Sequence, residues 1–128
     1  MTAKRRRWMA GLLAAAAWGA SRASRIEVVG DSMWPTLHPG DRLILVRSRR
    51  LRPGDLVAVV DPREARRTVV KRLVDVGPDG LTVLGDNPAA STDSRMFGKV
   101  AATAARGRVV YRYHPASRRG RISPGPPR

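Results

Sequence analysis

The sequence predicts a small, mainly β domain, built as a β-barrel or β-sheet, behind a short apolar and helical N-terminal segment. From residue 25 onward, short apolar runs alternate with turn sequences, which is typical of strands of about four to nine residues. No apolar pattern of helical period and length follows residue 25. The chain has 128 residues, enough for one domain with a modest core.

The first 24 residues have the pattern of a membrane anchor. Residues 4–7 are basic, and the 13 residues from Trp8 to Ala20 carry no charge. A basic flank before an apolar run indicates a signal peptide or an anchor, although a helix of this length spans only about 20 Å of a hydrocarbon core about 30 Å thick. A marginal span, a helix lying on an anionic surface, or an extension without function all remain open. We expect membrane association through this segment, with a cytoplasmic location as the alternative.

The body, residues 25–114, is expected to form the folded domain. Pro-Gly, Asp-Gly and Gly-Asp pairs separate its apolar runs and favour turns. The expected strands cover residues 26–29, 42–46, 56–60, 68–76, 81–84 and 108–113. Residues 115–128 contain only Pro, Gly, Ser and Arg apart from Ala116 and Ile122, which predicts a disordered basic tail.

Composition excludes several kinds of site. The chain contains no cysteine, so a cysteine nucleophile, a disulfide and a thiolate metal site are ruled out. Only His38 and His114 are present, which excludes a three-histidine zinc centre. The net charge of +15 arises at the two ends, because residues 26–105 carry 12 basic and 10 acidic side chains. We therefore expect no specific nucleic-acid partner.

Lys71 has an unusual setting for a lysine. In an extended strand, Val69, Lys71 and Leu73 share one face, so the ammonium group is flanked by two branched aliphatic side chains. Loss of water around a lysine lowers its pKa and favours the neutral amine, which can act as a general base. A lysine that extends to solvent from a half-buried strand is the alternative interpretation.

Two connecting segments offer further candidates. Ser32 lies in a short connection after the first expected strand, beside the apolar side chains of Met33 and Trp34. The 14 residues from Gly85 to Gly98 have no strand pattern, and a loop of that length in a small domain is usually functional or disordered. In this loop Asp93 and Arg95 are spaced to form a charge-assisted pair. Taken alone, each segment could also be an ordinary polar turn.

Together and in this order, these three segments resemble the serine–lysine peptidases of the type I signal peptidase family. The matching motifs are Ser-Met-Trp-Pro-Thr at residues 32–36, Val-Lys-Arg at 70–72, and Gly-Asp-Asn at 85–87 followed by Ser-Thr-Asp-Ser-Arg at 91–95. The resemblance covers about residues 26–113. Trp34 and the run Gly-Asp-Asn-Pro-Ala-Ala-Ser at 85–91 resemble one branch in particular, the nickel-type superoxide dismutase maturation proteases.

The resemblance implies a role for each matching residue. Ser32 would be the nucleophile, with its own backbone N–H donating to the oxyanion, and Lys71 would be the general base that Ser91 orients. It implies no metal or cofactor. The remaining matches fall into two groups, structural support of the site (Asp86, Asn87, Asp93 and Arg95) and candidate substrate contacts (Met33 and Trp34).

One position departs from the family pattern. Two residues before the nucleophile, the family often has a hydroxyl side chain that contributes to the oxyanion hole, and this chain has Gly30. Loss of one such donor typically costs about 2.7–4 kcal/mol. A backbone amide or water would have to replace it, or the enzyme would be slow. Asp31 is also unexpected at its position.

The sequence therefore predicts a serine endopeptidase that removes the N-terminal leader of a precursor protein, the proform of nickel superoxide dismutase. The alternative is a small type I signal peptidase that cleaves exported preproteins. A third hypothesis, from another class, is a basic β-barrel module that binds nucleic acid or an anionic membrane through residues 5–7 and 118–121. The composition of the body argues against the third hypothesis. Trp34 is its only tryptophan, so it lacks an aromatic platform on which the bases of a single-stranded nucleic acid could stack.

Overall fold

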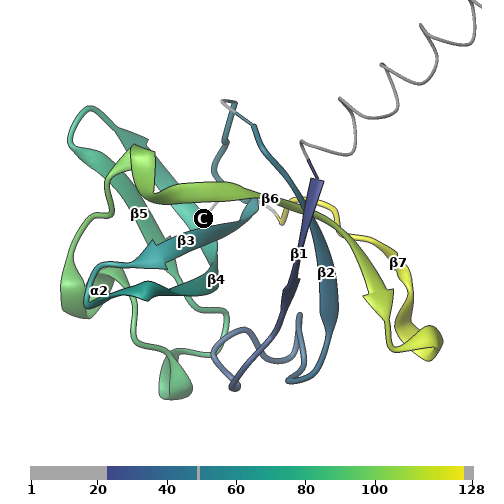
Figure 1. Cartoon of the computed structure of the whole chain (residues 1–128). Helices are drawn as coiled ribbons and strands as arrows, with labels where there is room; N and C mark the ends of the chain where they lie inside the picture. Colours follow the sequence, from purple (N-terminus) through teal and green to yellow (C-terminus); the bar gives the residue numbers. More distant parts are fainter. Residues whose placement is uncertain (1–22, 49, 126–128) are drawn as a thin grey trace, which may run out of the picture.

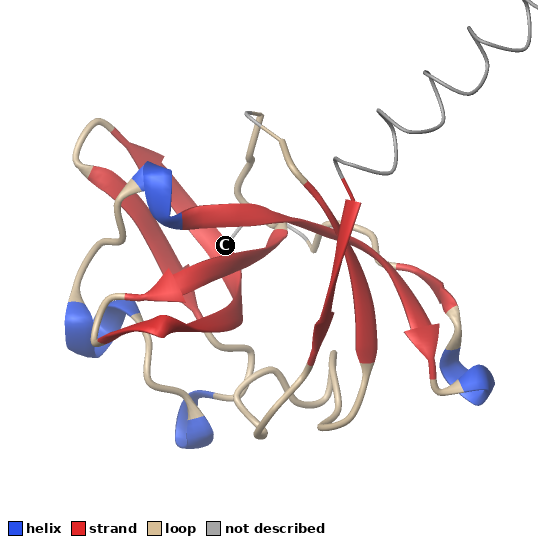
Figure 2. Cartoon of the chain, viewed as in Figure 1, coloured by secondary structure: helices blue, strands red, loops and turns tan. Residues whose placement is uncertain are grey.

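One antiparallel sheet of seven strands forms the domain. The computed structural model describes residues 23–48 and 50–125, and in this part of the chain the strands follow the order β1–β2–β6–β3–β4–β5, with β7 paired to β6 (Figure 1). The strands are β1 (Ala23–Glu27), β2 (Arg42–Val46), β3 (Leu56–Asp61), β4 (Glu64–Gly77), β5 (Gly80–Leu84), β6 (Ala105–His114) and β7 (Gly120–Arg121). The helical segments are short: η1 (Pro88–Ala90), α2 (Ser94–Phe97), η2 (Ala102–Ala104) and η3 (Ala116–Arg118) (Figure 2).

Strand β6 holds the two halves of the sheet together. Its later part, Arg108–His114, pairs with β2, and its first part, Ala105–Arg108, pairs with β3. Gly107 lies at the crossing, where a Cβ atom would come within 2.9 Å of the carbonyl oxygen of Val46. A side chain at this position would push the strands apart, so glycine permits the close approach.

Strand β3 is buried on both faces. Leu56 and Ala58 belong to one apolar cluster, together with residues of β1, β2 and the loop after β1. Val57 and Val59 point the other way, into a second cluster that includes Leu73 of β4 and Val83 of β5. Alternating side chains thus divide the core into two parts, and β4 runs along both of them.

The sequence-based strand predictions are confirmed, with differences at the ends. Strand β2 matches the expected range, while β4 begins four residues earlier than expected, at Glu64. It begins there because Asp61 pairs with Glu64 in a tight hairpin turn that local composition did not indicate. Strand β1 begins at Ala23, before the expected start of the domain.

The prediction of a disordered tail is wrong for residues 115–125. Arg118 pairs with the buried carboxylate of Asp41, and Arg112 of β6 joins the same carboxylate at 3.2 Å. The Ile122 side chain packs against the first apolar cluster, and its N–H donates to the carbonyl of Val110 at 3.0 Å. These contacts across the fold fix a segment that composition alone identifies as disordered.

The expected membrane anchor, residues 1–24, lies almost wholly outside the described residues, as do its two tryptophans, Trp8 and Trp18. Within the residues that the structure describes, none of the helices has the length and apolar character needed to cross a bilayer.

Asp41 is expected to be important for stability. Its alanine variant should lower the free energy of unfolding by about 3 kcal/mol, because two partly buried guanidinium groups lose their shared counter-ion. Urea denaturation followed by circular dichroism measures the loss. Glu27→Ala is the control, because the Glu27–Arg42 pair is exposed at 3.7 Å and should contribute less than about 1 kcal/mol. Equal losses in the two variants would contradict the expectation.

Candidate active site

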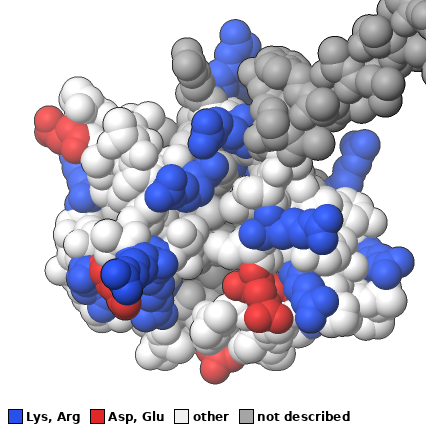
Figure 3. Space-filling view, viewed as in Figure 1, with Lys and Arg blue, Asp and Glu red and all other residues white. Residues whose placement is uncertain are grey.

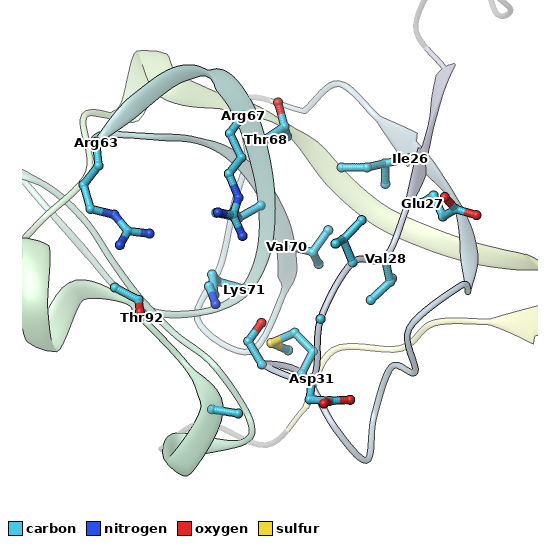
Figure 4. A pocket seen from close by; sticks show the side chains of 16 residues that line it. Ile26, Glu27, Val28, Asp31, Arg63, Arg67, Thr68, Val70, Lys71 and Thr92 are labelled. Carbon is cyan, nitrogen blue, oxygen red and sulfur yellow. The ribbon is translucent and has the colours of Figure 1, made fainter.

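A cavity of about 340 Å³ brings the candidate nucleophile and the candidate general base together. One wall comes from β1 and the loop that follows it, and the other from β4 and the turn before it (Figure 4). Ala90 and Thr92, from the loop after β5, also border the cavity. Ser32 lines the first wall and Lys71 the second.

A compact turn holds Ser32 at the cavity. The N–H of Trp34 donates to the carbonyl of Asp31 at 3.1 Å, which closes the turn around the serine. The next side chain, Met33, is buried and belongs to the first apolar cluster. Since Met33 points into the core, the neighbouring Ser32 remains only partly buried and borders the cavity.

The backbone before the serine accounts for the departure at Gly30. Gly30 has φ of +80°, a conformation that side chains with a Cβ rarely adopt. A Cβ atom at this position would meet nothing within 4 Å, so backbone conformation rather than space favours glycine here. A hydroxyl side chain at residue 30 would therefore strain the loop that carries Ser32.

Lys71 is buried, which decides between the two interpretations of its position in the strand. Its side chain is 4% exposed, and it lies opposite Val57 of β3. Burial lowers the pKa of the Lys71 ammonium group; the carboxylate of Asp93 opposes this effect, and the positive charges of Arg67 and Arg63 add to it. The balance lowers the pKa of Lys71 and so raises the share of the neutral amine, which is the form that can accept a proton.

A directed chain of hydrogen bonds begins at Lys71. Its Nζ donates to Ser91 Oγ at 3.2 Å, and the Ser91 hydroxyl donates in turn to Asp93 Oδ2 at 2.7 Å. Because the Ser91 proton is directed to Asp93, the Ser91 oxygen acts as the acceptor for Lys71. One N–H of the amine is thereby fixed, which restricts the directions that its lone pair can take.

Asp93 is fixed in its charged form. Burial disfavours the carboxylate, but hydrogen bonds from the Arg95 side chain, the Gly85 N–H and the Ser91 hydroxyl outweigh it and hold the pKa of Asp93 well below its usual range. Arg95 binds with two nitrogens, Nε at 2.9 Å from Oδ1 and Nη2 at 2.6 Å from Oδ2. The expected Asp93–Arg95 pair is confirmed, and it braces the loop that carries Ser91.

Gly85 lies between Ser91 and the serine loop, the connection after β1 that carries Ser32. A Cβ atom at residue 85 would lie 2.1 Å from Ser91 Oγ and 2.6 Å from the carbonyl oxygen of Ser32. The neighbouring Asn87 holds the serine loop from the same side, since its N–H donates to Ser32 O at 2.9 Å and its side chain donates to Asp31 O at 3.0 Å. The contact between these segments therefore needs glycine at residue 85.

Asp86 joins all three motifs through side chains. It accepts a hydrogen bond from Thr36 of the serine motif at 2.6 Å and a two-pronged contact from Arg72 of the lysine motif at 2.7 and 3.2 Å. The two partners are 50 and 14 residues away along the sequence. The four candidates for structural support, Asp86, Asn87, Asp93 and Arg95, thus all make contacts around the cavity.

Ser32 and Lys71 are not joined by a hydrogen bond, and Trp34 lies away from the cavity. Among the described residues, Ser91 is the hydrogen-bond partner of Lys71 Nζ, and no hydrogen bond joins that nitrogen to Ser32. Such bonds are often long before substrate binds. Met33 borders the cavity, but Trp34 does not; it is 45% exposed and stacks on His38, with the ring centroids 3.9 Å apart.

Some residues at the cavity were missed in the sequence. Arg63 and Arg67 lie on the β4 side of the cavity. Arg67, Val69 and Lys71 alternate along the strand and so share one face, a pattern that could have identified Arg67. Thr36 and Arg72 stood within recognised motifs, but no role was expected for either side chain. The described part of the chain holds no group of three or more His, Asp or Glu residues able to bind a metal.

The family described as signal peptidase, peptidase S26, matches residues 5–82. The match includes Ser32 and Lys71 and ends before the loop that carries Ser91.

Similar proteins are named as membrane proteases. The mitochondrial ATP-independent inner membrane protease subunit 1b of Arabidopsis thaliana is 32% identical over 124 residues, covering 76% of this chain and 73% of that protein. The mitochondrial inner membrane protease subunit 2 of Danio rerio is 31% identical over 127 residues, covering 79% and 69%. Subunit 1 of the same protease from Schizosaccharomyces pombe is 28% identical over 110 residues, covering 67% and 70%.

The buried lysine is expected to lower stability at neutral pH. Unfolded lysine is charged below a pKa of about 10.4, whereas burial disfavours the charged form of Lys71 in the folded chain. Stability is therefore lost as pH falls below that value. Lys71→Met should be more stable than wild type near pH 7, with the advantage shrinking toward about pH 10.

Urea denaturation at the two pH values tests this expectation. Lys99→Met is the matched control, because Lys99 is exposed and its replacement should give no such pH-dependent gain. An advantage of Lys71→Met that is the same at both pH values would contradict the expectation.

Proposed function

The chain belongs to the signal peptidase S26 family and is a serine peptidase, and from this premise we propose that Ser32 is its nucleophile and Lys71 its general base. The observation that carries the proposal is the buried amine of Lys71, which shares one cavity with Ser32. A neutral amine next to a hydroxyl group can activate that hydroxyl for attack on a carbonyl carbon. Ser91 is the positioning residue for the amine, and Asp93 and Arg95 fix Ser91.

The proposed reaction proceeds in two stages. Ser32 Oγ attacks the carbonyl carbon of the peptide bond while Lys71 Nζ takes the hydroxyl proton, and the protonated amine then gives that proton to the departing amino group. The leader remains on Ser32 as an ester. Lys71 next takes one proton from water as the water oxygen attacks the ester carbonyl, and it gives that proton to Ser32 Oγ as the ester bond breaks. The leader is released as a carboxylic acid, which loses its proton to solvent.

The proposed hydrogen-bond donor to the oxyanion is a backbone group, the N–H of Ser32. The N–H of Ser32 donates to no other group among the described residues, so it is available to an oxygen that binds beside Oγ. Gly30 supplies no hydroxyl, and its left-handed backbone accounts for that. A second donor would therefore come from another backbone amide or from water, and without one the enzyme would be slow.

We propose preproteins as the substrate class. The relatives are named as inner membrane proteases, and the family match begins at residue 5, so it includes the basic residues and the apolar run before the domain. We therefore propose that residues 1–24 associate the chain with a membrane, where leader sequences of preproteins lie. Valine and isoleucine side chains of β1, β4 and the adjoining loop border the cavity, which favours small apolar residues before the cut.

The narrower proposal is that the precursor is a nickel-type superoxide dismutase. Its support is the resemblance in Trp34 and the run at residues 85–91. The family and the named relatives favour general preproteins instead. We therefore place general preproteins first and the dismutase proform second.

The proposed dyad is tested by three variants in one precursor-processing assay. Ser32→Ala should reduce cleavage to background, and Lys71→Met should reduce it by at least about 10²- to 10⁴-fold, while both remain folded by circular dichroism. The wild-type rate should rise with pH as a single group loses its proton, with a midpoint below the ordinary lysine pKa of about 10.4, because burial lowers the pKa of Lys71. Lys99→Met should cleave like wild type; a Lys71→Met enzyme with normal activity would exclude Lys71 as the base.

The substrate is tested by presenting the enzyme with two purified precursors at equal concentration. One is a general exported preprotein with small residues before its cleavage site, and the other is a nickel superoxide dismutase proform. We expect the general preprotein to be cut at least as fast, as measured by kcat/KM. Cleavage of the dismutase proform alone would reverse the order, and in each case Ser32→Ala controls for contaminating proteases.

A further inference from the structure

Arginine side chains border the cavity beside the lysine. Arg63 and Arg67, from the turn before β4 and from β4 itself, line the same wall as Lys71. In Figure 4 the guanidinium group of Arg67 extends over the cavity toward the side where Lys71 lies. The proposed peptidase chemistry uses neither arginine.

An irregularity in the sheet leaves Arg67 without a partner on β3. Val60 of β3 pairs with Thr68, but the next residue, Asp61, pairs with Glu64. Residues 65–67 of β4 therefore have no partner on β3 and form a bulge. Bulges redirect side chains and are frequent beside active sites.

The two arginines differ in their partners. Arg63 makes a two-pronged contact with Asp61, at 3.1 Å for Nε and 2.9 Å for Nη2, so its charge is already neutralised. Arg67 is exposed and forms no ion pair with any described residue. Its charge acts on the buried carboxylate of Asp61 without forming an ion pair, so its N–H groups remain available to an anion that enters the cavity.

Acidic side chains line the opposite wall. Glu27 of β1 lies 3.7 Å from Arg42, whereas Asp31 forms no ion pair with the rest of the described chain. In Figure 4, Arg67 lies above Lys71 and points toward it, whereas Asp31 lies lower on the opposite wall with its carboxylate directed away from the lysine. A substrate carboxylate would therefore be attracted on the side of Arg67 and would gain no such contact on the side of Asp31.

We propose that Arg67 is a specificity-determining residue that binds an acidic side chain of the precursor. This inference rests on the proposed peptidase function and deepens it, since it adds a charge requirement to the preprotein substrate. Arg67 lies four residues from Lys71 along β4, and extended chains advance about 3.3 Å per residue. The favoured acidic residue is therefore within about four residues of the scissile bond, on the side away from Asp31.

General attraction to a basic protein must be separated from this local contact. The chain carries a net charge of +15, and basic side chains outnumber acidic ones on the face in Figure 3. The electrostatic attraction of this net positive charge would favour an acidic peptide whatever the position of its carboxylate. Binding by Arg67 favours a carboxylate at one or two adjacent positions.

The test is a set of peptides spanning one cleavage site, with a single Asp moved along the peptide and Asn at the same position as the uncharged match. The measured quantity is the ratio of kcat/KM for Asp over Asn at each position. Wild type should prefer Asp by about three- to fivefold at the positions that reach Arg67, and should not prefer it on the side of Asp31. In Arg67→Gln the preference should fall to about one, and Arg67→Glu should reverse it.

Arg66→Gln is the matched control. Arg66 is the neighbouring arginine in the same bulge, is exposed, and does not line the cavity, so its replacement removes the same charge and should leave the preference in place. Because Arg67 also lowers the pKa of Lys71, its replacement changes the rate for every peptide. That effect cancels in the Asp/Asn ratio at a fixed pH.

Failure of this inference is distinguishable from failure of the proposed function. If Ser32→Ala abolishes cleavage but the Asp preference persists in Arg67→Gln, or is the same at every position in wild type, Arg67 is not the determinant. If Ser32→Ala still cleaves, the proposed nucleophile is wrong instead.

Discussion

The buried amine of Lys71 is the feature on which the rest of the site depends. Lys71 is buried on β4, the strand that runs along both apolar clusters. Its ammonium form therefore loses contact with water without gaining a carboxylate in direct contact. Ser91 separates the amine from Asp93 and directs its own proton to that carboxylate. A direct Lys71–Asp93 pair would stabilise the ammonium form, whereas an intervening hydroxyl orients the amine and leaves it able to accept a proton.

This arrangement is held by contacts that do not include Lys71 itself. Asp86 connects Thr36 to Arg72, and Asn87 holds the backbone on which Ser32 stands. Gly85 lets the two segments meet at a distance that any side chain would prevent. Charged and polar groups therefore fix the position of the serine loop against β4, while the apolar clusters supply the stability that a buried lysine reduces.

Much of the fold could be predicted because strand formation is a local property. Strand β2 and the alternation of Val69, Lys71 and Leu73 followed from a period of two. The tail could not be predicted in this way. Its composition has few apolar residues, and the ordering of Arg118 comes from Asp41, a carboxylate 77 residues away along the chain. Local composition does not reveal a partner at that separation.

By itself, the sequence determined the strands, the face of β4 on which Lys71 lies and the motif residues of the site, because periodicity and turn chemistry act between neighbours. Only the tertiary structure decided how those motifs meet. The direction of the Ser91 hydroxyl, the role of Asp86 between Thr36 and Arg72, and the register shift that leaves Arg67 without a β3 partner depend on contacts between separate segments. Such pairing is fixed by how β3, β4 and the serine loop pack together, and no local pattern specifies it.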